Sequence, residues 1–152
     1  MSIRILIACE ESDEVRGRFE KLGFDAWSCD IQPNRNINAK HYQCDVFEII
    51  NDNWDIMIAF PPCTHLAVSG AAHFEKKRAD GRQQDAIDFF MALVNAPIKH
   101  IAIENPIGIM SNLYRKPNQV IHIIKFISLQ IKNIIRPLFS HSFCNSWKCF
   151  TS

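Results

Sequence analysis

Apolar and polar residues follow one another along the chain in blocks that predict a repeating series of strands and helices. Apolar runs of strand length lie at residues 2–10, 24–30, 41–45, 54–60 and 99–105. The first run, SIRILIACE, is almost continuously apolar, which is typical of a strand buried on both faces of a parallel sheet. Each run ends in polar residues or proline, so each should form a separate short strand.

The polar blocks between these runs predict helices. We expect two helices and a helical turn, over residues 12–23, 84–96 and 46–52. Ser12 is the expected N-cap of the first helix and Gly23 its C-cap, and Pro97 should end the second. The buried face of the first helix should comprise Val15, Phe19 and Leu22.

The order β-α-β-β-α-β predicts an α/β fold, a single-domain, doubly wound and mostly parallel sheet with helices on both faces. We expect residues 1–152 to form one domain, in which 122–152 are a tail of uncertain structure. For the Ile- and Lys-rich stretch at 120–135, a helix followed by a strand is slightly favoured over two strands.

Composition adds few constraints on function. The 152 residues are 47% apolar and 22% charged, as in a folded protein, and the net charge of +1 neither requires nor excludes a nucleic-acid partner. The six cysteines form no C-x-x-C pair, so no zinc framework is visible. Without a signal peptide or an apolar run of membrane-spanning length, we expect a cytoplasmic protein with reduced thiols and no membrane partner.

Polar or reactive residues follow all five predicted strands. In open parallel α/β sheets, ligands bind beyond the carboxyl ends of the strands. Those ends are Cys9-Glu10-Glu11, Asp30, Asp45, Phe60-Pro61-Pro62-Cys63 and Glu104-Asn105-Pro106. Any one acid could be an ordinary polar strand end, but five in a row favour a site. Asp30 could bind two ribose hydroxyls of a nucleotide, and Asp45 is placed for an adenine amino group.

The segment IAFPPCTHLAVSG presents a thiol directly after a strand. Because proline cannot donate to the sheet ladder, Pro61 and Pro62 should turn the chain out of the sheet and hold Cys63 on a stiff loop. Glu104 ends an adjacent predicted strand. A thiolate nucleophile beside a carboxylic acid suits covalent attack on an electron-poor ring, since the acid can protonate a ring nitrogen. Such an acid should have a raised pKa.

These motifs resemble those of a known enzyme family. PPCTHLAVSG resembles the Pro-Cys loop of DNA cytosine-5 methyltransferases, and AIENP resembles their Glu-Asn motif. The segments LIACEES, AWSCDIQP, QCDVFEI, FFMALVNAP and IAIENPIGIM are similar to short, largely phage and prophage proteins of the cytosine methyltransferase type that lack a target-recognition domain. The similarity runs from about residue 3 to residue 121.

The resemblance implies a class I, Rossmann-like methyltransferase that binds S-adenosylmethionine and acts on cytosine in DNA. It implies that Cys63 is the nucleophile that attacks C6 of a flipped base, that Glu104 is the acid and that Asn105 supports the loop. The implied cofactor-binding residues are Cys9, Glu10, Glu11, Asp30, Ile31, Asp45, Val46, Phe60 and Pro61. The candidate contacts to nucleic acid are His65, Ser69, Lys76, Lys77, Arg78 and Arg82, although the basic stretch reads equally well as solvated surface.

Three departures from the larger enzymes keep other functions open. The first turn, CEESDE, has no glycine, no recognition domain or arginine-rich motif follows the Glu-Asn strand, and the tail differs from that of the short group. The main alternative is a non-catalytic module on the same fold that binds nucleic acid or a protein. A hydrolase using Cys63 and His65 lacks an orienting acid, and a metal site at these two residues and His73 lacks a fourth ligand, so no metal is expected. Specificity could come from a homo-oligomer or a partner subunit.

Overall fold

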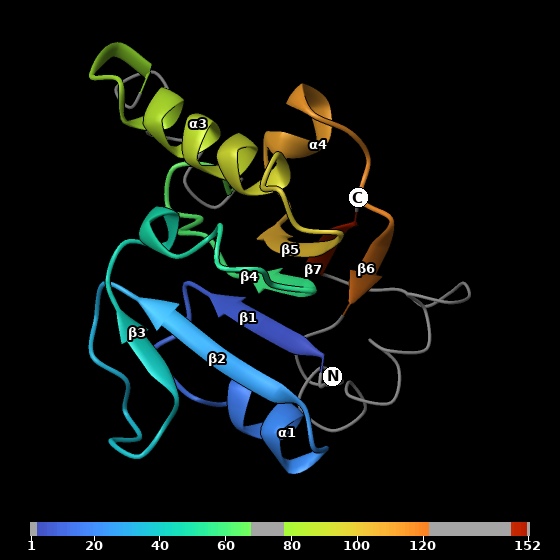
Figure 1. Cartoon of the computed structure of the whole chain (residues 1–152). Coiled ribbons are helices and arrows are strands. Elements are labelled where there is room, and N and C mark those ends of the chain that lie inside the picture. Colours follow the sequence, from blue (N-terminus) through green and yellow to red (C-terminus); the bar gives the residue numbers. More distant parts are fainter. Residues whose placement is uncertain (1–2, 68–77, 122–146, 152) are drawn as a thin grey trace. The chain divides into compact units, whose positions relative to one another are not determined.

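Five parallel strands form the larger part of a seven-stranded sheet in the computed structural model, which describes residues 3–67, 78–121 and 147–151. The strands run in the order β3-β2-β1-β4-β5 (Figure 1). They are β1 (Arg4–Ala8), β2 (Asp25–Asp30), β3 (His41–Gln43), β4 (Ile56–Ala59) and β5 (His100–Pro106). All five predicted strands are therefore present, and the predicted parallel α/β sheet is confirmed.

Helices and short turns connect these strands. They are α1 (Arg16–Lys21), the 3-10 helix η1 (Val46–Glu48), α3 (Arg82–Val94) and α4 (Met110–Leu113). Two further strands, β6 (Gln119–Ile121) and β7 (Trp147–Thr151), pair in antiparallel fashion and were not predicted. Val120 and Ile121 are thus in a strand where a helix was slightly favoured. Most of the predicted tail, at 122–146, lies outside the described residues.

The chain divides into two compact units. Unit 1 comprises Met1–Pro61, Met91–Ile103 and Thr151–Ser152, and unit 2 comprises Pro62–Phe90 and Glu104–Phe150. The core of unit 1 is built on β1, whose residues from Ile5 to Ala8 are fully buried, and on the neighbouring strands and α1. The buried apolar residues of unit 2 include Leu66, Ala67, Phe90 and Met110. Within the described ranges, no helix is long and apolar enough to cross a membrane.

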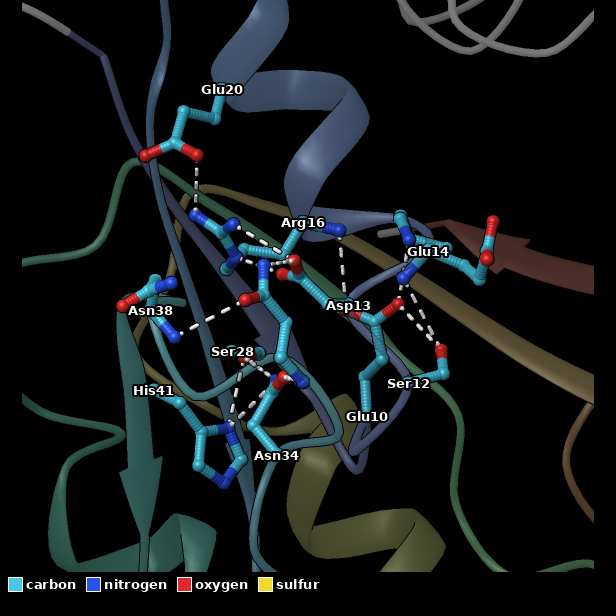
Figure 2. Close-up of polar contacts among 12 residues, drawn as sticks. Glu10, Ser12, Asp13, Glu14, Arg16, Glu20, Ser28, Asn34, Asn38 and His41 are labelled. Carbon is cyan, nitrogen blue, oxygen red and sulfur yellow. Dashed lines mark hydrogen bonds and ion pairs between the residues drawn. The ribbon is translucent and has the colours of Figure 1, made fainter.

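The start of α1 differs from the prediction, because Ser12 is not its N-cap. The helix begins at Arg16, and the Glu10 carboxylate accepts hydrogen bonds from the backbone N–H groups of Val15 (2.6 Å) and Arg16 (3.1 Å), as Figure 2 shows. Asp13 has a φ of 65°, which excludes a regular helical turn at that position. A carboxylate at the end of β1 therefore satisfies the free N–H groups at the start of the helix.

The end of α1 follows the prediction for Gly23. Its φ is 87°, and its N–H donates to the Glu20 carbonyl while the Phe24 N–H donates to the Phe19 carbonyl. This is the Schellman arrangement, in which glycine adopts the left-handed conformation at low cost. Phe19 is buried, as predicted, but Leu22 is half exposed, because it is the C-cap residue and lies past the last helical turn.

The second predicted helix is shifted by two residues at each end. It spans Arg82–Val94 and follows Gly81, which has a φ of 82° and whose carbonyl accepts from the Asp85 N–H. The helix ends before the Asn95-Ala96-Pro97 turn, as expected for a stop imposed by proline.

Candidate active site

The strand order reverses at β1, which pairs with β2 on one side and with β4 on the other. In open parallel sheets the crevice beyond the carboxyl ends at such a reversal is the usual ligand site. The residues at these ends in unit 1 are Cys9 after β1, Asp30 at the end of β2 and Phe60-Pro61 after β4. The fold therefore offers a ligand site where the sequence predicts one.

A carboxylate cluster, defined here as Cys9, Asp30 and Asp45, comprises the first two of these strand ends and the residue that caps η1 after β3. Burial, together with the negative charges of Asp30 and then Asp45, raises the pKa of the Cys9 thiol to about 12. Since those charges act on one thiol, the two aspartates are close to the turn after β1. Cys9 itself has a φ of 58°, so this turn adopts the left-handed conformation that glycine favours without having a glycine.

The two aspartates are held by their own backbone surroundings. One carboxylate oxygen of Asp30, Oδ1, accepts from the Gln32 N–H at 2.8 Å, and no hydrogen bond to its other oxygen occurs among the described residues. Asp45 caps η1 in a capping box, in which it accepts from the Phe47 N–H at 3.0 Å and its own N–H donates to Glu48 at 3.2 Å. Both carboxylates are thus oriented before any ligand binds.

The other residues predicted to bind the cofactor differ from one another in burial and in their bonding partners. Glu10 is buried, and its carboxylate caps α1, while Glu11 forms an ion pair with Arg35 of the loop after β2. Ile31 is 70% exposed next to Asp30, whereas Val46 is buried. The backbone N–H of Phe60 donates to the Ala8 carbonyl at 2.9 Å, and Pro61 is buried.

The buried Cys29 and the half-buried Cys44, whose thiols lie close together, were not predicted as a pair. The sulfurs of Cys29 and Cys44 are 3.8 Å apart, and burial, followed by the influence of Cys44, raises the pKa of Cys29. The sequence feature that could have predicted this pair is the Cys-Asp dipeptide, which occurs at 29–30 and again at 44–45. A thiol with a raised pKa is a weak nucleophile, so Cys29 acts as a small core side chain.

The predicted nucleophile lies in a tight turn, the Cys63 loop, defined here as residues 63–67. The Cys63 carbonyl accepts from the N–H groups of Leu66 and Ala67, both at 2.9 Å. The thiol is half-buried, while Pro62 is exposed and Leu66 is fully buried. The first residue of the Cys63 loop is therefore partly accessible to solvent, whereas the end of the loop is packed in the protein interior.

Unit 2 brings Cys63 and Glu104 within electrostatic range of one another. Burial raises the pKa of Glu104 to about 8. Burial first, and the charge of Glu104 second, raise the pKa of the Cys63 thiol. At neutral pH the pair is therefore mainly a neutral acid beside a neutral thiol. The buried oxygen Oε1 of Glu104 has no hydrogen-bond partner among the described residues, so the acid is placed to donate its proton to a ligand.

Asn105 lies on the opposite face of β5 from Glu104, because burial alternates along the strand with Ile103 and Asn105 inside. It is 1% exposed, and its carbonyl oxygen Oδ1 has no partner among the described residues. The support of the Cys63 loop by this side chain stays a prediction.

Sequence reasoning missed two residues that hold the Cys63 loop. The Gln83 side chain, buried in the first turn of α3, donates to the His65 carbonyl at 3.3 Å. Gly108, after β5, forms a bridge with Ala67, and the neighbouring Ile109 N–H donates to the Leu66 carbonyl at 3.0 Å. The signals were a polar residue at a buried helix position and a glycine inside Pro-Ile-Gly-Ile.

The predicted nucleic-acid contacts fall only partly on described residues. Arg78 and Arg82 are exposed, and Arg82 forms an ion pair with Asp80. The Nδ1 nitrogen of His65 is buried without a partner in the part of the chain that is described. The remaining candidates, Ser69, Lys76 and Lys77, lie outside the described residues, as does His73.

In comparisons with known proteins, no family model and no curated protein matches this chain.

The residues of the carboxylate cluster fit the nucleoside end of S-adenosylmethionine. Asp30 keeps one carboxylate oxygen for ribose hydroxyls, and the exposed Ile31 beside it offers an apolar surface to an adenine ring. Asp45 adds an acceptor for the adenine amino group. The fit is weaker at the amino-acid end, where the Glu10 carboxylate already accepts two backbone hydrogen bonds.

Proposed function

We propose that this chain is an S-adenosylmethionine-dependent DNA cytosine-5 methyltransferase, with the class I methyltransferase version of the Rossmann-like fold. Asp30, Ile31 and Asp45 would hold the nucleoside end of the cofactor, which supplies an electrophilic methyl group. The observation that carries the proposal is the pairing of Cys63 with Glu104, a half-buried acid whose pKa is raised to about 8 by burial. Hence the acid keeps its proton at neutral pH and can give it to a ring nitrogen.

The proposed chemistry uses both members of this pair. The thiolate of Cys63 bonds to C6 of a cytosine that has been flipped out of the stack, while Glu104 donates its proton to N3, so that the ring accepts the electron pair. C5 then becomes nucleophilic and would take the methyl group from the sulfonium of the cofactor, which would leave as S-adenosylhomocysteine. Loss of the C5 proton to a base, departure of the Cys63 sulfur from C6 with its electron pair, and return of the N3 proton to Glu104 restore the aromatic ring and the free enzyme.

One observation favours the alternative, a non-catalytic module that binds nucleic acid or a protein. Burial and Glu104 raise the pKa of Cys63, so little thiolate is present in the free protein. An enzyme would have to lower this pKa when the substrate binds, whereas a binding module would have no such need.

A trapping experiment separates these two functions. With cofactor and DNA that contains 5-fluorocytosine, the wild-type chain should form a covalent complex that survives denaturing electrophoresis. The complex is trapped because C5 carries fluorine in place of the hydrogen that is lost as a proton in the final step. Cys63→Ala should abolish the band, and Glu104→Gln should reduce it at least about tenfold, since the amide has no acidic proton to give. A wild-type chain that binds the cofactor but traps no DNA would favour the binding module.

Cofactor binding is tested by removing charge from the carboxylate cluster. Asp30→Asn and Asp45→Asn should each weaken binding of S-adenosylhomocysteine about tenfold, because each change removes a charged hydrogen-bond acceptor but keeps an oxygen for the local backbone bond. Calorimetry measures the dissociation constants. The control is Asp25→Asn at the opposite end of β2, where Asp25 bonds Lys40 and Trp27. No heat and no shift in melting temperature for the wild-type chain would refute the cofactor site.

A further inference from the structure

The backbone of the Cys63 loop approaches Gly108 too closely for any side chain at that position. A Cβ atom on Gly108 would lie 2.1 Å from the Leu66 carbonyl oxygen and 2.8 Å from its carbonyl carbon. Real contacts of this kind are not shorter than 3.0 Å. The φ of Gly108 is not in the left-handed region, so the requirement for glycine here is one of space.

Hydrogen bonds continue on both sides of this contact. The Leu66 carbonyl accepts from Ile109, and the Gly108 carbonyl accepts from the Ser111 hydroxyl at 2.8 Å. The Cys63 carbonyl accepts from the Leu66 N–H within the same loop. A continuous set of backbone bonds thus runs from the residue that carries the thiol to the segment four residues after Glu104.

Gln83 provides a second attachment, from α3. Its amide nitrogen donates to the His65 carbonyl, and the side chain is buried, so the bond is shielded from water. The next residue, Gln84, is exposed, and among the described residues its side chain bonds within its own helix, to Asp88 at 2.8 Å. The two glutamines therefore form a matched pair in which one holds the loop and the other does not.

We propose that Gly108 and Gln83 are positioning residues that hold the Cys63 thiol beside the Glu104 carboxyl. This inference rests on the proposed function for the role of the thiol, but the arrangement itself can be measured without methyl transfer. Neither residue is assigned a direct part in the chemistry. Each acts through the backbone of the Cys63 loop.

The test measures how strongly Glu104 controls the reactivity of Cys63. Iodoacetamide labelling at pH 9, read at the peptide that contains Cys63 by mass spectrometry, reports the thiolate there and not at the other cysteines. Glu104→Gln should raise this rate about fivefold in an otherwise wild-type chain, because the charge that disfavours the thiolate is removed. In the Gln83→Met and Gly108→Ala backgrounds, the same change should raise the rate less than about twofold.

The matched control is the Gln84→Met background, in which the full effect of Glu104→Gln should remain. Circular dichroism checks that each variant is folded, and Gln83→Met alone decides the question if Gly108→Ala does not fold. The proposal is overturned if Glu104→Gln acts equally in the Gln83→Met and Gln84→Met backgrounds, or has no effect in the wild-type chain. Suppose that Gln83→Met abolishes the effect of Glu104→Gln on Cys63 labelling, but that the wild-type chain traps no DNA. The positioning role would then be correct and the proposed function wrong.

Discussion

Unfolding by urea should show that the protein becomes less stable as the pH rises from 5 to 9, and that Glu104→Gln removes much of this loss. The pKa of Glu104 is raised from 4.5 in the unfolded chain to about 8 in the folded one, by burial. The folded state therefore binds the proton more tightly than the unfolded state does. The resulting stabilisation is complete below pH 4.5 and is lost as the pH rises through about 8.

The expected size follows from the same shift. The loss between pH 5 and pH 9 should be on the order of 4 kcal/mol, because each unit of a pKa shift corresponds to about 1.4 kcal/mol. Glu104→Gln resembles the protonated acid at every pH, so it should match the wild-type chain near pH 5 and exceed its stability at pH 9. The comparison is limited to pH 9, since the raised pKa of Cys63 would add a second loss at higher pH.

Glu14→Gln is the control for this measurement. Glu14 is exposed and forms a surface ion pair with Arg18 at 3.4 Å, which is worth only a few tenths of a kcal/mol. This variant should retain the fall in stability seen in the wild-type chain. If Glu104→Gln is no more stable than the wild-type chain at pH 9, the carboxyl is not buried in solution, and the main support for the proposed function is lost.

The sheet could be predicted from the sequence because its strands are nearly continuous apolar runs. β1 is buried from Ile5 to Ala8, and such a run has few other stable arrangements. Gly23 could be predicted for a similar reason, since a glycine after an amphipathic stretch has a local role that needs no tertiary partner. Secondary-structure elements that are determined by their own local sequence are therefore the ones that could be predicted.

The missed features all depend on contacts between distant segments. Ser12 was a reasonable N-cap, but Glu10 of the preceding strand takes that role because Asp13 adopts a left-handed conformation. Gly108 matters because of a backbone 42 positions earlier, at Leu66, and no local pattern contains that contact.

The candidate site shows the same division. Cys63 and Glu104 could be chosen from short motifs, and unit 2 brings them within electrostatic range. Their surroundings, which raise the pKa of the acid and hold the thiol loop, come from burial and from Gln83 and Gly108. These surroundings could not be predicted from residue types alone.

Arg16→Met should destabilise unit 1 by about 3 kcal/mol in urea unfolding, whereas Arg18→Met, two residues along the same helix, should change its stability by less than about 0.5 kcal/mol. The Arg16 side chain is 2% exposed and forms ion pairs with Asp13 and, at 3.0 Å, with Glu20 (Figure 2). The Arg18 side chain is 32% exposed and forms an ion pair with Glu14, whose side chain is 72% exposed. The two arginines thus differ in their own burial and in the burial of Asp13 compared with Glu14.

The large cost arises because the Asp13 carboxylate, whose side chain is only 12% exposed, would be left without its cation. Its carboxylate is bonded to the Arg16 guanidinium and to the Asn36 amide at 2.7 Å, which connects the turn after β1 to the loop after β2. Because Asn tolerates the left-handed conformation of residue 13, Asp13→Asn removes the charge and keeps the backbone. The double variant Asp13→Asn/Arg16→Met should therefore be at least about 1.5 kcal/mol more stable than the sum of the two single changes predicts. Strictly additive effects would show that the two charges do not depend on one another, and that the turn beside the carboxylate cluster is held by its backbone alone.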